Sequence, residues 1–188
     1  MHARYLLPIA VVVALAQIGV LASMIMDRAA ILRDGREVVL EVLPVDPRDL
    51  LRGDYVRLTY NISSIPAEMF AGADSAESGI VYVRLKPGEG GIWQPIAARF
   101  GQPLAAAPAP DEVDIRGTTY TRDLENVRIV GVDYGIERFY VPEGEGRPIE
   151  ENLRERTFRM AVAVGQDGTA QIKAFFDGET LIYREPLY

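Results

Sequence analysis

A long apolar segment near the N-terminus limits most strongly what this chain can fold into. The segment runs from Tyr5 to Met26 and carries no charged side chain. At about 1.5 Å of rise per residue, a helix of this length crosses a hydrocarbon core of roughly 30 Å. We therefore predict a transmembrane helix within an N-terminal unit of residues 1–33, with the bilayer as a partner through residues 5–26. Apolar residues at 29–32 indicate that the helix continues past the membrane face.

A cleaved signal peptide is the alternative interpretation of this segment. Arg4 precedes it, and Val20-Leu21-Ala22 forms a passable cleavage site. We favour an anchor because the apolar stretch is longer than the hydrophobic region of most signal peptides. Arginines after the segment favour a cytoplasmic domain, whereas a short N-terminal tail before a span is typical of a signal anchor that exports the domain behind it. We predict an extracytoplasmic domain.

Residues 34–188 have the pattern of a mainly β domain. Short runs of alternating apolar and polar residues are separated by glycine, proline and aspartate, which indicates strands joined by turns. This density of strands predicts a β-sandwich or barrel-like domain with one or two short helices. The predicted strands are residues 36–45, 55–62, 79–86, 92–100, 113–121, 126–133, 136–141, 157–165, 169–177 and 180–185. The other predicted elements are a helical turn at 66–70, a loop or linker at 101–110 and a helix at 148–156.

Three pairings are predicted among these strands. The first two form an antiparallel pair with a wide charged connection, 79–86 and 92–100 form a hairpin, and the last three form a meander. The charged connection begins Pro44-Val-Asp-Pro-Arg-Asp49 and ends at Gly53-Asp54. Its prolines and aspartates stop the first strand, because proline lacks an N–H and aspartate competes for backbone donors.

Two blocks of the sequence resemble a known family. Gly53-Asp54-Tyr55, two residues, Leu58, one residue and Tyr60 match the signature of the GDYXXLXY family of membrane-anchored bacterial proteins. The block at 134–150 is similar to the second well-marked segment of that family. The resemblance covers nearly the whole chain. It implies a single-pass protein of the bacterial inner membrane, and it names no reaction.

The candidate site residues come from these two blocks. They are Asp46, Arg48, Asp49, Arg52, Gly53, Asp54, Tyr55, Leu58, Tyr60, Tyr134, Glu137, Glu143 and Glu150. One interpretation is a site for a small molecule or a partner, because polar groups on loops between rigid strands converge at such sites. The interpretation that we favour is structural and concerns the first block: its aspartates at 46 and 49 cap backbone donors, its arginines pair with carboxylates, and Tyr55, Leu58 and Tyr60 pack.

Composition excludes several kinds of chemistry. The chain has no cysteine, and its one histidine is His2, which excludes disulfides, thiol nucleophiles, the usual zinc sites and Ser-His-Asp catalysis. The net charge of −7 argues against nucleic acid as a partner. Calcium is a weak alternative for the carboxylates of 46–54, because their spacing is not that of an EF-hand and two arginines would compete with the cation. We predict no cofactor and no metal.

Enzyme interpretations rank lower. The run from Pro47 to Val56 loosely resembles the segment after the nucleophile in signal-peptidase-type serine proteases, but Val45 occupies the place of the serine. A carboxylate-based hydrolase of an envelope polymer would use the glutamates of the second block as acid or base. Trp93, Tyr82 and Phe100 would line a sugar groove in such an enzyme, although such aromatics more often belong to a core.

The function that these observations favour is binding. We predict a membrane-anchored accessory module for a polytopic membrane protein or for the envelope, and not an enzyme. The remaining alternative is a scaffold whose motifs only make the fold.

Overall fold

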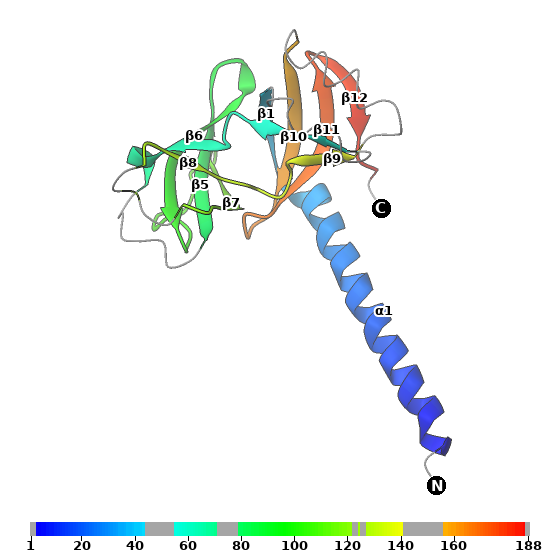
Figure 1. The fold of residues 1–188 in the computed structure, drawn as a ribbon. Helices are drawn as coiled ribbons and strands as arrows, with labels where there is room; N and C mark the ends of the chain where they lie inside the picture. The colour runs from blue at the N-terminus through cyan, green and yellow to red at the C-terminus, as the bar shows by residue number, and fades with distance from the viewer. Residues whose placement is uncertain are drawn as a thin grey trace.

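The structure, a computed structural model, describes residues 3–43, 55–70, 79–121, 124, 127–140 and 156–186. In this part of the chain, one long N-terminal helix precedes a β-rich domain of antiparallel sheets, which confirms the predicted fold class (Figure 1). Helix α1 spans Ala3–Asp34, and the β domain lies at its C-terminal end.

Helix α1 exposes its apolar side chains over most of its length. The large apolar residues between Ile9 and Met26 are 50–69% exposed. The stretch Pro8–Asp34 is long and apolar enough to cross a bilayer, and none of its most apolar part is buried in the protein. Each such side chain forgoes roughly 1.5–3 kcal/mol of stabilisation while it remains in water. Within the described residues, the apolar part of α1 therefore has no protein surface that covers it.

The end of α1 passes directly into the first strand, β1 (Arg36–Leu43). Leu32 is 1% exposed, and the N–H of Gly35 donates to the carbonyl of Ile31 at 2.9 Å. A Cβ on Gly35 would lie 2.4 Å from the carbonyl oxygen of Ile31 and 3.0 Å from that of Val164. Only glycine fits this approach, and the helix joins the domain without a linker. The helix extends past residue 26, as predicted.

Five antiparallel strands form the larger sheet, in the order β12-β11-β10-β1-β3. The bounds of the four further strands are Thr59–Tyr60 for β3, Phe158–Val164 for β10, Ala170–Asp177 for β11 and Thr180–Arg184 for β12. The last three strands form the predicted meander, and β1 pairs with β3 as predicted. The long pairing of β1 with β10, which joins the two ends of the domain, was not among the predicted pairings.

Three antiparallel strands form a second sheet, in the order β6-β5-β7. Their bounds are Ile80–Pro87 for β5, Trp93–Phe100 for β6 and Val113–Thr118 for β7. Strands β5 and β6 form the predicted hairpin. Their connection contains a 3-10 turn, η3 (Glu89–Gly91), in which Gly90 and Gly91 have φ values of 63° and 76°. This left-handed conformation favours glycine at both positions.

Two short ribbons complete the domain. Strand β2 (Tyr55–Arg57) pairs with β9 (Arg138–Tyr140), and β4 (Ser64–Pro66) pairs with β8 (Ile129–Gly131). The strand predicted at 55–62 is divided at Leu58, whose N–H donates to the carbonyl of Glu137 at 2.8 Å. The predicted helical turn at 66–70 is a 3-10 turn, η2 (Ala67–Met69). The predicted helix at 148–156 lies outside the described residues except for its last residue.

A single hydrophobic core joins the sheets. One face of β1, formed by Val38, Leu40 and Val42, is 0–4% exposed. Val83 of β5 and Ile115 of β7 belong to the same buried cluster. The two larger sheets and the ribbons therefore share one core.

Candidate functional site

The two family-like blocks of the sequence meet at the β2–β9 ribbon. Tyr55 lies opposite Tyr140, and Arg57 lies opposite Arg138. Because the pairing is antiparallel, the first residue of β2 and the last residue of β9 lie at the same end of the ribbon.

Two buried tyrosines lock these blocks together. The hydroxyl of Tyr60 donates to the carbonyl of Ile136 at 2.6 Å, and the hydroxyl of Tyr134 donates to the carbonyl of Ile62 at 2.7 Å. Tyr60 is 0% exposed and Tyr134 is 5% exposed. Burial raises the pKa of both phenols well above the usual value, and the charge of Glu137 raises these pKa values further. The two hydroxyls are therefore protonated, and each acts as a hydrogen-bond donor that holds the fold.

The side chain of Glu137 also accepts a hydrogen bond from the backbone of its own turn. Its Oε1 accepts a hydrogen bond from the N–H of Tyr134 at 2.5 Å, and its carbonyl accepts the N–H of Leu58. Leu58 itself is 1% exposed in the core. Four of the predicted site residues therefore act in the fold: Leu58, Tyr60, Tyr134 and Glu137. The Glu137 carboxylate caps a turn, which argues against its predicted use as a general acid or base.

Most other predicted site residues lie outside the described part of the chain. They are Asp46, Arg48, Asp49, Arg52, Gly53, Asp54, Glu143 and Glu150, and for Tyr55 the structure describes the backbone pairing alone. In the described residues, no group of three or more His, Cys, Asp or Glu side chains gathers as a metal site would require. The calcium interpretation concerned the carboxylates of residues 46–54, which lie outside the described residues.

The aromatic residues considered for a sugar groove have different surroundings. Trp93 is 6% exposed, and the guanidinium of Arg36 lies over its ring at 5.7 Å from the centroid. Phe100 stacks on Phe70 with 4.6 Å between ring centroids. Trp93 and Phe100 belong to the core or pack against it, as their residue types favoured. Tyr82 lines a cavity.

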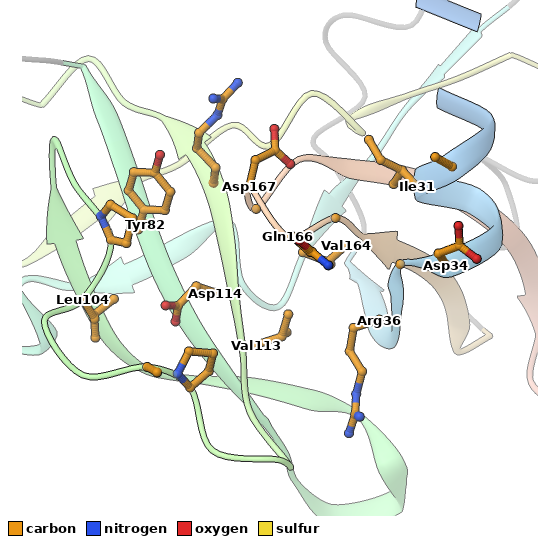
Figure 2. Close-up of a pocket in the computed structure, with 18 of the residues that line it drawn as sticks. Ile31, Asp34, Arg36, Tyr82, Leu104, Val113, Asp114, Val164, Gln166 and Asp167 are labelled. Carbon is orange, nitrogen blue, oxygen red and sulfur yellow. The ribbon is translucent and has the colours of Figure 1, made fainter. Parts of the chain in front are cut away.

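That cavity, which we call the junction cleft, has a volume of about 740 Å³ and lies where α1 meets the two larger sheets. Figure 2 shows Ile31 and Asp34 of α1 on one side and Leu104 and Tyr82 on the other. The turn between β10 and β11 forms a further wall. Segments far apart in the sequence build the cleft, and no sequence motif predicted it.

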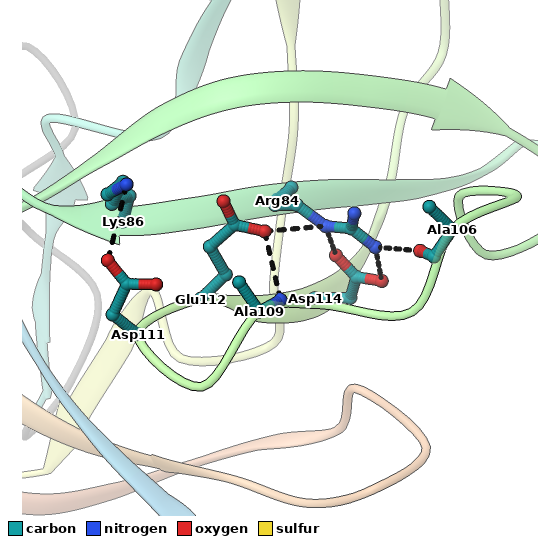
Figure 3. A network of polar contacts seen from close by, with 7 residues as sticks. All are labelled: Arg84, Lys86, Ala106, Ala109, Asp111, Glu112 and Asp114. Carbon is teal, nitrogen blue, oxygen red and sulfur yellow. Dashed lines mark hydrogen bonds and ion pairs between the residues drawn. The ribbon is translucent and has the colours of Figure 1, made fainter.

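A buried arginine holds the loop that forms the outer wall of the cleft (Figure 3). Arg84 of β5 is 7% exposed and donates to both carboxylate oxygens of Asp114, at 2.7 and 2.8 Å, and to the carbonyl of Ala106 at 2.6 Å. The hydrogen bond to Asp114 raises the pKa of Arg84, and the nearby Glu112 adds to this effect. The predicted loop or linker at 101–110 is therefore fixed to the second sheet, and a bidentate pair of this kind is geometrically specific.

The opposite wall of the cleft is also fixed by hydrogen bonds. Asp167 accepts from the N–H and the hydroxyl of Thr169, at 3.0 and 2.6 Å, and these bonds lower the pKa of Asp167. Gly168, with a φ of 83°, accepts the N–H of Arg116 through its carbonyl at 2.8 Å. The cleft thus has preformed walls of small and apolar residues, with carboxylates and guanidinium groups among them. Such a surface suits a peptide segment with apolar side chains and charges of both signs.

The comparisons with known proteins agree with the sequence signature. The sequence model of the GDYXXLXY protein family matches residues 17–175, which is most of the chain. The chain belongs to the GDYXXLXY protein family. The match includes the second half of the apolar segment, the signature block and the β domain as far as β11. Neither the curated proteins nor the solved structures contain a match to this chain.

The buried residues of the family signature share a structural role. Two signature positions of this GDYXXLXY protein, Leu58 and Tyr60, are core residues with 1% and 0% exposure. The hydroxyl of the tyrosine holds the second block in place. In its described positions, the signature therefore specifies how two distant segments pack.

Proposed function

We propose that this GDYXXLXY protein is a single-pass membrane protein whose acidic β domain binds a protein partner of the same membrane or of the envelope. The observation that carries the proposal is the composition of the junction cleft. Helix α1 itself contributes Ala30, Ile31 and Asp34 to the wall. A ligand in this cleft therefore touches the base of the anchor.

The exposed apolar surface of α1 supports the anchoring part of the proposal. Transfer of this surface from water into a bilayer provides a strong driving force for insertion. Fractionation of cells followed by alkaline carbonate extraction tests the membrane anchor directly. We expect the full chain in the extracted membrane pellet. Recovery in the soluble fraction would contradict the anchor.

The distance along α1 supports a partner at the membrane surface. Met26 is the last residue of the charge-free segment, and Ala30, the first residue of the cleft wall, follows it by four residues. The cleft therefore begins about 6 Å farther along the helix axis, within the depth of a headgroup layer. A juxtamembrane segment of another membrane protein reaches the cleft without leaving the membrane surface.

The proposed location is the extracytoplasmic face of a bacterial inner membrane. Because the chain has no cysteine, a single introduced cysteine reports its own side of the membrane. Glu179→Cys is suitable, since Glu179 is exposed in the turn between β11 and β12. A membrane-impermeant maleimide added to intact spheroplasts should label this variant. Labelling that requires lysis would reverse the proposed orientation.

Site-specific photo-crosslinking in native membranes tests the binding function. A photo-reactive amino acid replaces Leu104, which lines the cleft, and in a matched control it replaces Ile96, which is 44% exposed on β6. We expect a discrete adduct at position 104 that is absent at position 96. The same products from both positions, or none from either, would oppose the cleft as the contact surface.

A purely structural role is the second candidate function. The observation in its favour is that Leu58, Tyr60 and Tyr134 act in the fold. A scaffold predicts that every variant loses function in proportion to lost stability. Loss of the adduct at position 104 in a variant of unchanged stability would separate the two candidates.

A further inference from the structure

Gln17 places a polar amide in the middle of the apolar segment of α1. The stretch from Leu6 to Met26 contains two polar side chains, those of Gln17 and Ser23. The hydroxyl of Ser23 donates to the carbonyl of Val20, in the same helix, at 2.8 Å. Across the described residues, the amide of Gln17 has no such hydrogen bond, and the side chain is exposed. Gln17 therefore carries the polar group of this stretch that a partner outside the chain must satisfy.

The depth of Gln17 keeps its amide away from water on both sides of a bilayer. Gln17 follows Tyr5 by 12 residues and precedes Met26 by 9, which is about 18 Å and about 14 Å along the helix axis. A glutamine side chain is too short to reach either membrane surface from there. An amide that leaves water without a hydrogen-bond partner is strongly unfavourable. In membranes, glutamine side chains form hydrogen bonds between neighbouring helices.

Gln17 lies at the centre of one continuous face of the helix. We call this face the Gln17 seam; its residues are Ala10, Ala14, Gln17, Leu21 and Met24. They are separated alternately by four and three residues, which is the spacing of the contact face in a left-handed helix pair. The alanines allow a second backbone to approach closely. All five side chains are exposed, and none of the most apolar part of α1 is buried in the protein, so the β domain leaves the seam open.

A second copy of this chain fits the seam by symmetry. An amide has both a donor and an acceptor, so two glutamines satisfy each other. All copies of a single-pass protein insert in the same orientation, so two α1 helices lie parallel and their Gln17 residues lie at the same depth. A two-fold axis along the membrane normal then brings each Gln17 amide opposite its copy. A polar side chain in such a contact face also fixes the register of parallel helices.

The opposite face of α1 is the competing contact surface. Ala16, Gly19 and Ser23 gather there, and small residues also allow helices to approach closely. The hydroxyl of Ser23 is already bonded within its own helix and requires no partner. The unsatisfied amide therefore favours the Gln17 seam over this face.

We propose that this protein forms a parallel homodimer in the membrane, in which the Gln17 seams of two α1 helices pack together and the two Gln17 amides hydrogen-bond to each other. The inference rests on the proposed membrane anchor. Each α1 passes directly into its own β domain, so the pairing holds two domains at one membrane surface. The dimer presents two junction clefts, one at the base of each helix.

Disulfide crosslinking in native membranes identifies the face that forms the contact. Because the chain has no cysteine, each variant carries a single one. Met24→Cys lies on the Gln17 seam, and the matched control Met26→Cys lies on the opposite side of the helix at nearly the same depth; the native side chains are 63% and 69% exposed. After mild oxidation we expect a product of twice the chain mass, at least about fivefold more abundant for Met24→Cys. Equal yields, or a crosslink to a different protein, would overturn the homodimer.

The role of the amide is measured by energy transfer between copies of the full chain in detergent micelles, with dyes attached at Glu179→Cys. The variants are Q17L, which removes the amide, Q17N, which keeps one, and S23A as the control. We expect Q17L to weaken the dimer about five- to thirtyfold, Q17N to restore most of the affinity and S23A to change it less than about twofold. A Q17L dimer as tight as the wild type, or an equal loss in S23A, would contradict pairing through Gln17.

Failure of the dimer and failure of the proposed function give different results. Carbonate extraction of the wild type and of Q17L tests the anchor alone, and both should remain in the membrane pellet because leucine favours insertion. Wild-type protein in the soluble fraction would remove the anchor and the dimer with it. The photo-adduct at position 104 reports the partner at the junction cleft, so this adduct in a protein that forms no dimer would overturn the helix pairing alone.

Discussion

Tyr60 and Tyr134 exchange hydrogen bonds with each other's segments, since each hydroxyl donates to the carbonyl two residues beyond the other tyrosine. The acceptors are Ile136 and Ile62, at 2.6 and 2.7 Å. This reciprocal arrangement binds the signature block to the block at 134–137 across more than seventy residues of chain, with |i−j| values of 76 and 72. The burial of both phenols should affect the stability of the domain and its dependence on pH.

Removal of either hydroxyl should destabilise the domain. In Y60F or Y134F, a buried carbonyl loses its donor, which costs about 1–2 kcal/mol of unfolding free energy. Chemical unfolding of the detergent-solubilised full chain measures this loss, with Y120F as the control because Tyr120 is 95% exposed. The control should change by less than about 0.5 kcal/mol. Equal effects at all three positions would show that the reciprocal bonds do not stabilise the fold.

Alkaline pH should destabilise the protein through the same residues. Burial raises the pKa of both phenols in the folded state, so they remain neutral above pH of about 10, where unfolded tyrosines ionise. Unfolding then releases protons, and stability falls as pH rises above about 10, by up to about 1.4 kcal/mol per pH unit for each tyrosine. Between pH 7 and 9, roughly, these two residues add no pH dependence.

The alkaline effect is measured as a difference between proteins. Unfolding free energies are compared from about pH 9 to pH 11 for the wild type and for Y134F. The fall should be shallower in Y134F, because one buried phenol is missing. Parallel curves would mean that another group controls the alkaline transition.

The buried pair of Arg84 and Asp114 should stabilise both the second sheet and the wall of the junction cleft. In R84M, the carboxylate of Asp114 and the carbonyl of Ala106 lose their donor, at a cost of about 2–4 kcal/mol. The loop at 101–112 should also become more sensitive to protease. The matched control is K86M on the same strand, since the Lys86–Asp111 pair at 3.2 Å is exposed and should contribute little. Similar losses in the two variants would contradict a special role for Arg84.

Sequence patterns predicted most of the strands and turns, because strand alternation and turn residues depend only on neighbouring residues in the chain. Alternating apolar and polar residues indicated strands such as β5 and β6, and the glycines between them indicated a turn. The prediction of one strand at 55–62 was less accurate, because the strand is divided at Leu58. The N–H of Leu58 donates to the carbonyl of Glu137, which lies far away in the sequence. The pairing of β1 with β10 was not predicted for the same reason: the residues of one strand do not identify a partner strand that is distant in the sequence.

Sequence patterns indicated residues of the signature, but they did not indicate the junction cleft. The structural interpretation of Leu58 and Tyr60 came from their residue types and strand positions, whereas no such role was predicted for Tyr134, which is 5% exposed. The junction cleft depends on contacts between segments such as α1, β7 and the β10–β11 turn. The spacing of residues in the sequence does not predict such a contact. Arg84 was overlooked because an arginine on a strand usually lies on a solvated face, whereas here Asp114 and Ala106 accept its donors.

If the charged connection forms the partner surface, its arginines should be needed for capture of that partner. Pull-down of the full chain from native membranes should recover a partner that is lost when Arg48 and Arg52 are both replaced by alanine. The matched control is R99A, at a half-buried arginine on β6. Recovery of the same proteins by the doubly substituted chain would leave the junction cleft as the better candidate.

The rigid connection between α1 and the β domain should depend on Gly35. In Gly35→Ala, the new Cβ would lie 2.4 Å from the carbonyl oxygen of Ile31, which real structures do not tolerate, so the helix end must shift. The shift would displace Ile31 and Asp34 and thereby widen the junction cleft that they line. Gly19→Ala is the matched control, because no atom lies within 4 Å of a Cβ there and alanine favours a helix. We expect Gly35→Ala to lose about 1–3 kcal/mol of unfolding free energy and the photo-adduct at position 104, and Gly19→Ala to keep both. An unchanged adduct in Gly35→Ala would show that the cleft does not need a fixed helix.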